Sequence, residues 1–246
     1  MSRVALITGA ARGLGASIAQ RLHAAGYRVA LADVQLEGVQ QLADQLDPSG
    51  QSALALQLDV RLKTDFQTTC ALLSERWGGC DVLVNNAGKS KVAALMDITP
   101  EEFDESMAIN LRGTFVGCQV FGQHFADRGF GRIINIASLA GQNGGTATGA
   151  HYAAAKGGVA TLTKVFAREL AAKGVTVNSI SPGPLDLPIV HETVAPDRLA
   201  QIKQMIPVGS LGSADYIADT VLLLAAENAS SVTGACWDIN GGLFMR

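Results

Sequence analysis

Short runs of apolar residues alternate with helical patterns along the whole chain, and several of these runs are apolar at every position. Strands that expose one face alternate apolar and polar residues, whereas strands buried on both faces are apolar throughout. The runs VALIT, DVLVN, RIINIA and TVNSI are of the second kind. Crossover helices between parallel strands cover both faces of a sheet. The pattern therefore predicts an α/β fold with a doubly wound parallel sheet flanked by helices on both faces.

The same patterns predict where the elements lie. Strands are expected at residues 3–8, 28–33, 52–58, 82–85, 132–137, 175–181 and 235–239. Helices are expected at residues 14–25, 35–46, 63–77, 152–170 and 214–226. A long helix after Pro100 should be broken near Asn110 and end before Gly129. Residues 182–207 are predicted to be less regular.

Composition limits the classes of protein that fit. The chain has 246 residues, 48% of them hydrophobic, and no linker, which suits one domain spanning residues 1–246. The net charge of −3 and the lack of a basic cluster argue against nucleic acid or a membrane surface as partner. The chain runs straight into a strand, leaving no room for a signal peptide. Four scattered cysteines suggest free thiols and no metal site, so a cytoplasmic location is expected.

A glycine-rich turn follows the first strand and precedes the first helix. The run TGAARGLG at residues 8–15 has the spacing GxxxGxG. Glycines allow a tight turn and bring the free amides at the helix N-terminus close to an anion. We expect the turn to bind the pyrophosphate of a dinucleotide. Its expected contacts are Gly9, Arg12, Gly13, Leu14 and Gly15. Glycines also end strands for structural reasons, but a position after the first strand of a βαβ unit favours the nucleotide site.

Asp33 ends the second strand and bears on the choice of dinucleotide. A carboxylate there can accept hydrogen bonds from the adenosine ribose and would repel a 2′-phosphate, which favours NAD. Arg12 acts in the opposite sense, because a guanidinium in the turn could neutralise that phosphate. No basic residue follows Asp33 in Val-Gln-Leu at 34–36. The sequence predicts NAD, with NADP less favoured. The structural alternative for Asp33 is an exposed strand-end acid or a helix N-cap.

Tyr152 and Lys156 are four positions apart in a run of helix formers, so their side chains share one helical face. An ordinary tyrosine has a pKa of about 10. A nearby ammonium lowers that pKa, which lets the phenol exchange a proton with a carbonyl or alcohol oxygen. Ser138 follows the strand at 132–137 and could donate a hydrogen bond to the same oxygen. The Tyr-x-x-x-Lys spacing also arises by chance, and it gains weight from the other motifs.

These motifs together resemble the short-chain dehydrogenase/reductase family over essentially all 246 residues. The shared motifs are TGxxxGxG at 8–15, Asp59-Val60, Asn85-Asn86-Ala87-Gly88, Asn110, the set Ser138/Tyr152/Lys156, Pro182-Gly183 and Asn240-Gly241-Gly242. The resemblance implies a Rossmann-type fold and an NAD(P)-dependent oxidoreductase. Such an enzyme interconverts a ketone and a secondary alcohol by hydride transfer.

The resemblance also implies a role for each matching residue. Ser138 would orient the substrate oxygen, Tyr152 would exchange the proton, and Lys156 would bind the nicotinamide ribose and lower the tyrosine pKa. Asn110 would hold a water that links Lys156 to solvent. The remaining cofactor contacts would be Asp59 and Val60 at the adenine, Asn86, Ala87 and Gly88 at the adenosine ribose, and Pro182, Gly183 and Leu185 at the nicotinamide.

Substrate and partners are less constrained. The tail most resembles 3-oxoacyl-acyl-carrier-protein reductases, but it is also common among alcohol and sugar dehydrogenases. Arg128 and Lys173 could form a basic surface for an acyl carrier protein. The ketoacyl reductases generally use NADPH, which disagrees with Asp33. A non-catalytic dinucleotide-binding protein is the alternative of another class, and such a protein would be expected to have lost Ser138, Tyr152 or Lys156.

Two departures from the family affect the substrate side. Ser138 and Tyr152 are one position further apart than in many carrier-protein reductases, and Leu187 replaces a threonine that binds the nicotinamide carboxamide. Residues 184–210 are predicted to form a lid over the substrate, because long irregular segments are often binding loops. The alternative for this segment is a static connection. The Ala-rich helices within 113–126 and 153–172 suggest a homotetramer, as in the family.

Overall fold

The computed structural model of the chain describes residues 2–145 and 148–246. Its centre is a seven-stranded sheet in the order β3-β2-β1-β4-β5-β6-β9, in which every neighbouring pair is parallel. The strands are β1 Val4–Thr8, β2 Arg28–Asp33, β3 Ala53–Gln57, β4 Val82–Asn85, β5 Gly131–Ile136, β6 Val175–Pro182 and β9 Cys236–Ile239. The predicted doubly wound parallel sheet is confirmed.

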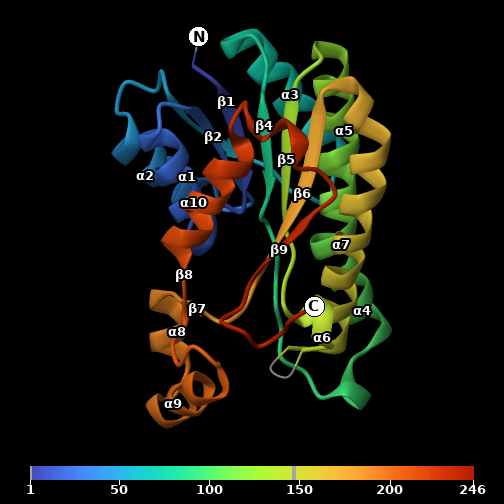
Figure 1. The fold of residues 1–246 in the computed structure, drawn as a ribbon. Helices are drawn as coiled ribbons and strands as arrows, with labels where there is room; N and C mark the ends of the chain where they lie inside the picture. Colours follow the sequence, from blue (N-terminus) through green and yellow to red (C-terminus); the bar gives the residue numbers. More distant parts are fainter. Residues whose placement is uncertain (1, 146–147) are drawn as a thin grey trace.

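Helices cover both faces of this sheet. They are α1 Gly13–Ala24, α2 Leu36–Leu46, α3 Lys63–Trp77, α4 Pro100–Met107, α5 Gly113–Arg128, α6 Ala140–Asn143, α7 Ala150–Leu170, α8 Pro188–Thr193, α9 Pro196–Met205 and α10 Ala214–Ala225. Short 3₁₀ turns lie at Leu95–Asp97, Ala171–Lys173 and Ala229–Ser231. Helices α1, α2 and α10 lie on one face, and α3, α5 and α7 on the other (Figure 1).

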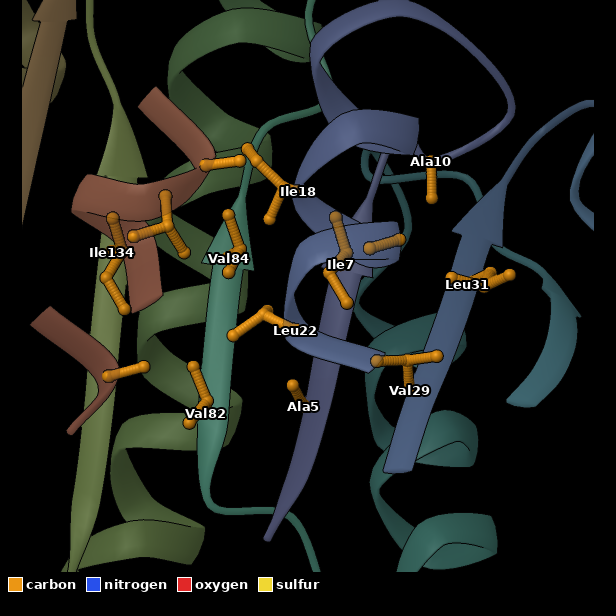
Figure 2. Packing of buried hydrophobic residues seen from close by; sticks show 14 of the residues in the cluster. Ala5, Ile7, Ala10, Ile18, Leu22, Val29, Leu31, Val82, Val84 and Ile134 are labelled. Atoms are coloured by element: carbon orange, nitrogen blue, oxygen red, sulfur yellow. The ribbon is translucent and has the colours of Figure 1, made fainter. Parts of the chain in front are cut away.

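The core consists of one apolar layer on each face of the sheet. On β1, Ala5 and Ile7 belong to the layer under α1, α2 and α10, whereas Val4 and Leu6 belong to the layer under α3, α5 and α7. Figure 2 shows the first layer, in which Ile7 packs with residues of α1 and the neighbouring strands. Because successive side chains of a strand point to opposite faces, both sets must be apolar. This explains why these strands are apolar throughout.

The chain reverses its direction across the sheet between β3 and β4. Strands β1, β2 and β3 follow one another toward one edge, and β4 then pairs with the other side of β1. The carboxyl ends of β1 and β4 therefore meet at the point where the strand order switches. Open α/β sheets bind their ligands at such a point, because the following loops diverge and leave a crevice.

The long helix after Pro100 is interrupted as predicted. A π-helical segment, Ala108–Arg112, separates α4 from α5 and carries the fully buried Asn110. Helix α5 ends before Gly129, whose φ of 70° suits a left-handed C-terminal cap. Insertions of this kind recur at functional sites because they turn a side chain out of the regular helical register.

The predicted irregularity of residues 182–207 is wrong. Two helices, α8 and α9, occupy much of this segment, and its short strand β7 Leu185–Asp186 pairs with β8 Gly212–Ser213. Pro188 and Pro196 each stand at the start of a helix. Proline at the first helical position costs no hydrogen bond and presets φ, so these prolines start helices and do not break them.

The four cysteines are free thiols, with Cys80 and Cys118 buried and Cys70 and Cys236 partly exposed. Across the described ranges, no helix has both the length and the apolar character needed to cross a membrane.

Candidate functional site

The glycine-rich turn packs tightly against the loop that follows β4. A Cβ atom at Gly9 would lie 2.7 Å from Ala87 Cα, and one at Gly15 would lie 2.1 Å from the Gly9 carbonyl oxygen. Gly9 also has a φ of 67°, which favours glycine. The Asn86 side-chain amide donates to the carbonyls of Thr8 (2.9 Å) and Gly9 (3.1 Å). The two loops at the switch point therefore form one rigid unit.

The N-terminus of α1 is left available to an anion. Every residue of this helix is described. Its N-cap residue, Arg12, makes no side-chain capping hydrogen bond, and its first turn contains no acidic residue. The first amides of a helix need acceptors, and the helix dipole favours negative charge there. These amides and the close packing of glycines suit a pyrophosphate, and its binding at this turn stays a prediction.

A cavity of about 640 Å³ opens beside this unit. Its lining includes ten residues that the sequence predicts as cofactor contacts: Gly9, Arg12, Leu14, Gly15, Asp33, Asp59, Val60, Asn86, Ala87 and Gly88. Its other lining residues are Val34, Gln35, Leu58, Arg61, Lys89, Glu105 and Ile109. The predicted residues Gly13, Tyr152, Lys156, Pro182, Gly183 and Leu185 are not in this lining. The cavity thus gathers the residues predicted for the adenosine and, with the exception of Gly13, those predicted for the pyrophosphate, but not those predicted for the nicotinamide.

Asp33 is held in place by the backbone around it. One carboxylate oxygen accepts from the Ala11 amide at 3.3 Å, and the other accepts from the Gln35 amide at 3.0 Å. The carboxylate thus braces the glycine-rich turn and lines the cavity together with Arg12. Asp33 is not the N-cap of α2, because Gln35 occupies that position.

Arg61 is a cavity residue that sequence reasoning missed. Its guanidinium forms an ion pair with Asp59, and its backbone amide donates to the same carboxylate at 2.9 Å. The hydrogen bond from Arg61 lowers the pKa of Asp59. The signal in the sequence is an arginine two positions after the acid, next to the Asp-Val motif. Any ligand that approaches Asp59 meets a paired and not a free carboxylate.

Ser138, Tyr152 and Lys156 come together beyond the carboxyl end of β5. Ser138 lies in the loop after β5, and its hydroxyl is near enough to the Tyr152 side chain to lower the pKa of the phenol. The Lys156 ammonium nitrogen lies 5.7 Å from the centre of the Tyr152 ring and donates to the Ile136 carbonyl at 2.7 Å. The predicted side-by-side arrangement of the tyrosine and the lysine is therefore present.

The pKa values of these groups differ from the sequence expectation. Burial raises the pKa of Tyr152 above its ordinary value, while the hydrogen bond with Ser138 lowers it. Burial lowers the pKa of Lys156 to about 8. The net direction for Tyr152 is therefore upward, opposite to the lowering by Lys156 that the sequence predicts. Removing the phenol from water disfavours its anion, and this effect is larger than that of the polar partner Ser138.

Asn110 lies next to this set and fixes the loop after β4. Its amide nitrogen donates to the carbonyls of Lys89 and Ser106, both at 3.0 Å, and its oxygen accepts from the Lys89 amide at 3.0 Å. A Cβ atom at Gly88 would lie 2.9 Å from the Asn110 oxygen and 3.6 Å from the Lys156 nitrogen. Gly88 thus lets the loop run between Asn110 and Lys156.

The segment predicted to meet the nicotinamide follows β6. The Pro182 carbonyl accepts from the Leu139 amide at 2.9 Å, which joins this segment to the turn that carries Ser138. A Cβ atom at Gly183 would lie 2.9 Å from Asn240 Cα. A Cβ atom at Gly13 would lie 3.9 Å from Cδ1 of Leu187. The chain after Leu185 therefore passes beside the glycine-rich turn.

Known proteins are similar to this chain over nearly its whole length. A family model described as enoyl-(acyl carrier protein) reductase matches residues 9–244. An acetoacetyl-CoA reductase of Rhizobium meliloti is 38% identical over 245 residues and is covered in full, as is this chain. A D-threitol dehydrogenase of Mycolicibacterium smegmatis is 36% identical, with 99% of this chain and 94% of the relative covered. The 3-oxoacyl-(acyl-carrier-protein) reductase FabG of Escherichia coli is 35% identical, with 99% and 98% covered.

The family model covers nearly the whole chain, and each of these relatives exceeds 30% identity over nearly its full length. The parallel sheet, the switch-point cavity and the grouped Ser138, Tyr152 and Lys156 agree with the resemblance drawn from the motifs. The chain belongs to the short-chain dehydrogenase/reductase family of oxidoreductases.

Proposed function

We propose that the protein is an NAD-dependent oxidoreductase that interconverts a ketone and a secondary alcohol, with Tyr152 as general acid and base. The observation that carries the proposal is the grouping of Ser138, Tyr152 and Lys156 next to the switch point of the sheet. The Ser138 hydroxyl lies near enough to that of Tyr152 to affect its pKa, so two hydroxyls are available at one place. A carbonyl oxygen bound there would accept one hydrogen bond from each.

The residues present fit a nicotinamide dinucleotide. The cradle of Gly9 and Gly15 and the uncapped start of α1 suit the pyrophosphate, and the cavity residues Asp33 and Asp59 suit the adenosine half. When bound, the nicotinamide would supply or accept the hydride. Lys156 would hold its ribose after exchanging the Ile136 carbonyl for the ribose hydroxyls.

Side chains of the protein would transfer the proton to and from the substrate oxygen. In the reductive direction, the Tyr152 hydroxyl gives its proton to the oxygen that becomes the alcohol, and in the oxidative direction it takes that proton back. The raised pKa of Tyr152 keeps the phenol protonated near neutral pH, which suits the reductive direction. A charged Lys156 would stabilise the phenolate that remains, and Asn110 would hold the water that returns the proton from solvent.

For the cofactor, we favour NAD because Asp33 is fixed by two backbone amides and cannot turn away from a 2′-phosphate without losing them. Arg12 lines the same cavity and is the group that would favour NADP. We further propose that residues 184–210 cover the substrate. Leu185, Leu187, Ile189 and Val190 would then offer an apolar wall to the substrate.

A 3-oxoacyl thioester reductase is the second candidate function. The names of two relatives, an acetoacetyl-CoA reductase and a 3-oxoacyl-(acyl-carrier-protein) reductase, favour it. A relative of similar identity is named a D-threitol dehydrogenase, which favours a small polyol. An acyl carrier protein is a proposed partner only under the thioester alternative.

The test is a panel of ketones, secondary alcohols, polyols and 3-oxoacyl thioesters, each assayed with NAD(H) and NADP(H). Tyr152→Phe removes one oxygen and should lower turnover by about 10²–10⁴-fold while cofactor affinity is retained. Tyr216→Phe is the matched control, because Tyr216 is 62% exposed on α10 and lies outside the grouped residues. Near-normal turnover in Tyr152→Phe would refute the proposed mechanism. Dinucleotide binding without turnover on any substrate would favour the non-catalytic alternative.

A further inference from the structure

The turn that carries Ser138 is held from two sides by backbone contacts. The Ser138 hydroxyl oxygen accepts from the Ala140 amide at 3.1 Å, at the start of the short helix α6. A Cβ atom at Gly141 would lie 2.5 Å from the Gly157 nitrogen, so α6 packs directly on α7. The third side of α6 faces β9, and polar side chains make that contact.

These side chains form a chain of hydrogen bonds that ends at Arg246. The Gln142 amide on α6 donates to Asp238 Oδ1 on β9 at 2.6 Å. Arg246 donates to both oxygens of the same carboxylate, at 2.7 Å from Nε to Oδ2 and 3.0 Å from the terminal nitrogen to Oδ1. Figure 1 shows the end of the chain lying beside α6. A bidentate arginine–carboxylate pair fixes the plane of the carboxylate as well as its position.

These hydrogen bonds fix the orientation of the Gln142 side-chain amide. Its amide nitrogen faces the Asp238 carboxylate, and its buried oxygen has no hydrogen-bond partner among the described residues. Turning the amide over would set its oxygen against the carboxylate. The hydrogen bond from Arg246 also lowers the pKa of Asp238, so this acceptor stays ionised at neutral pH.

We infer that Asp238 and Arg246 are positioning residues for the Ser138 hydroxyl and act through Gln142 and α6. The inference rests on the proposed function, because it assigns Ser138 a part in the reaction. Without Arg246, the Asp238 carboxylate could turn toward water and release Gln142, and α6 would lose its hydrogen bond to β9. Small displacements of a group that contacts the reacting oxygen reduce turnover strongly, even when binding is unchanged.

The experiment measures kcat and the KM for cofactor in Arg246→Ala, Arg246→Lys and Asp238→Asn, each in the natural and the Ser138→Ala background. In the natural background we expect Arg246→Ala to lower kcat by about 5–30-fold, with the KM for cofactor changed less than about twofold. Arg246→Lys should recover part of the loss. In the Ser138→Ala background, the same substitutions should lower kcat by less than about twofold, because the Ser138 hydroxyl that Asp238 and Arg246 position is absent.

Arg21→Ala is the matched control, because the Arg21 side chain is as exposed as that of Arg246 and forms an ion pair with Asp219 between α1 and α10. Thermal melting of each variant shows whether its fold is retained. An equal loss from Arg246→Ala in both backgrounds, or no loss while Ser138→Ala is impaired, would overturn the inference. Normal turnover in Ser138→Ala itself would overturn the proposed role of Ser138, and the inference with it.

Discussion

The buried Lys156 should destabilise the protein at neutral pH, and replacing it with methionine should show this. Its side chain is 3% exposed, and burial lowers its pKa from 10.5 to about 8. The native state therefore releases this proton more readily than the unfolded chain. Between about pH 8 and pH 10.5 the unfolded state binds more protons, so the stability contributed by Lys156 rises with pH through this window. Below about pH 8 the full cost of the charge is present.

The size of the effect follows from the shift. A change of about 2.5 pKa units corresponds to about 3 kcal/mol, of which about 2 to 3 kcal/mol is recovered between pH 7 and pH 10. Lys156→Met removes the charge but also leaves the Ile136 carbonyl without its donor, which costs about 1–3 kcal/mol at every pH. The pH dependence of the difference between the two proteins isolates the ionisation, because the packing and hydrogen-bond terms cancel.

The assay is denaturant unfolding of the cofactor-free protein and of Lys156→Met at several pH values from 7 to 10. Protein concentration is held constant, since cofactor and self-association both shift apparent stability. The natural protein should gain about 2 to 3 kcal/mol relative to the variant across this range, or very roughly 5–10 °C in Tm. A difference that stays constant with pH would show that Lys156 ionises as an ordinary lysine, and it would refute the reasoning.

Four further predictions can be tested separately. Gly9→Ala should abolish dinucleotide binding and destabilise the fold, because its Cβ would lie 2.7 Å from Ala87 Cα; calorimetric titration with NAD tests this, and unchanged affinity would contradict it. NAD(H) should outperform NADP(H), and Asp33→Ala should narrow the gap in kcat/KM; a natural enzyme that prefers NADPH would show that Arg12 decides the choice. Hydrogen exchange across residues 185–205 should slow when cofactor and substrate bind, and unchanged protection would leave the lid without support. Sedimentation should show a homotetramer, because α5 and α7 expose Phe115 and Val165 by 39% and 48%; a monomer at all concentrations would exclude it.

Local sequence patterns predicted the layers of the fold and most of the lining of the switch-point cavity. Runs such as VALIT are apolar at every position, and only strands covered on both faces need this pattern. The GxxxGxG turn marks the first βα junction, and the residues predicted for the adenosine half come together in one cavity. These signals are readable because periodicity and turn chemistry are local properties of the chain. The broken helix at Asn110 was predicted for the same reason.

The electrostatics of the site and the contacts that support it arise only on folding, so local sequence patterns do not predict them. The pKa values of Tyr152 and Lys156 depend on how far folding removes each group from water, which the spacing of the two residues cannot reveal. Residues 184–210 contain helices because Pro188 and Pro196 start them, and either role of proline fits the sequence. The effect that we infer for Arg246 on Ser138 passes through the hydrogen bonds of Asp238 and Gln142 and through α6. Gln142 and Asp238 are distant in the sequence and meet only because β9 lies beside α6, so no local pattern records their contact.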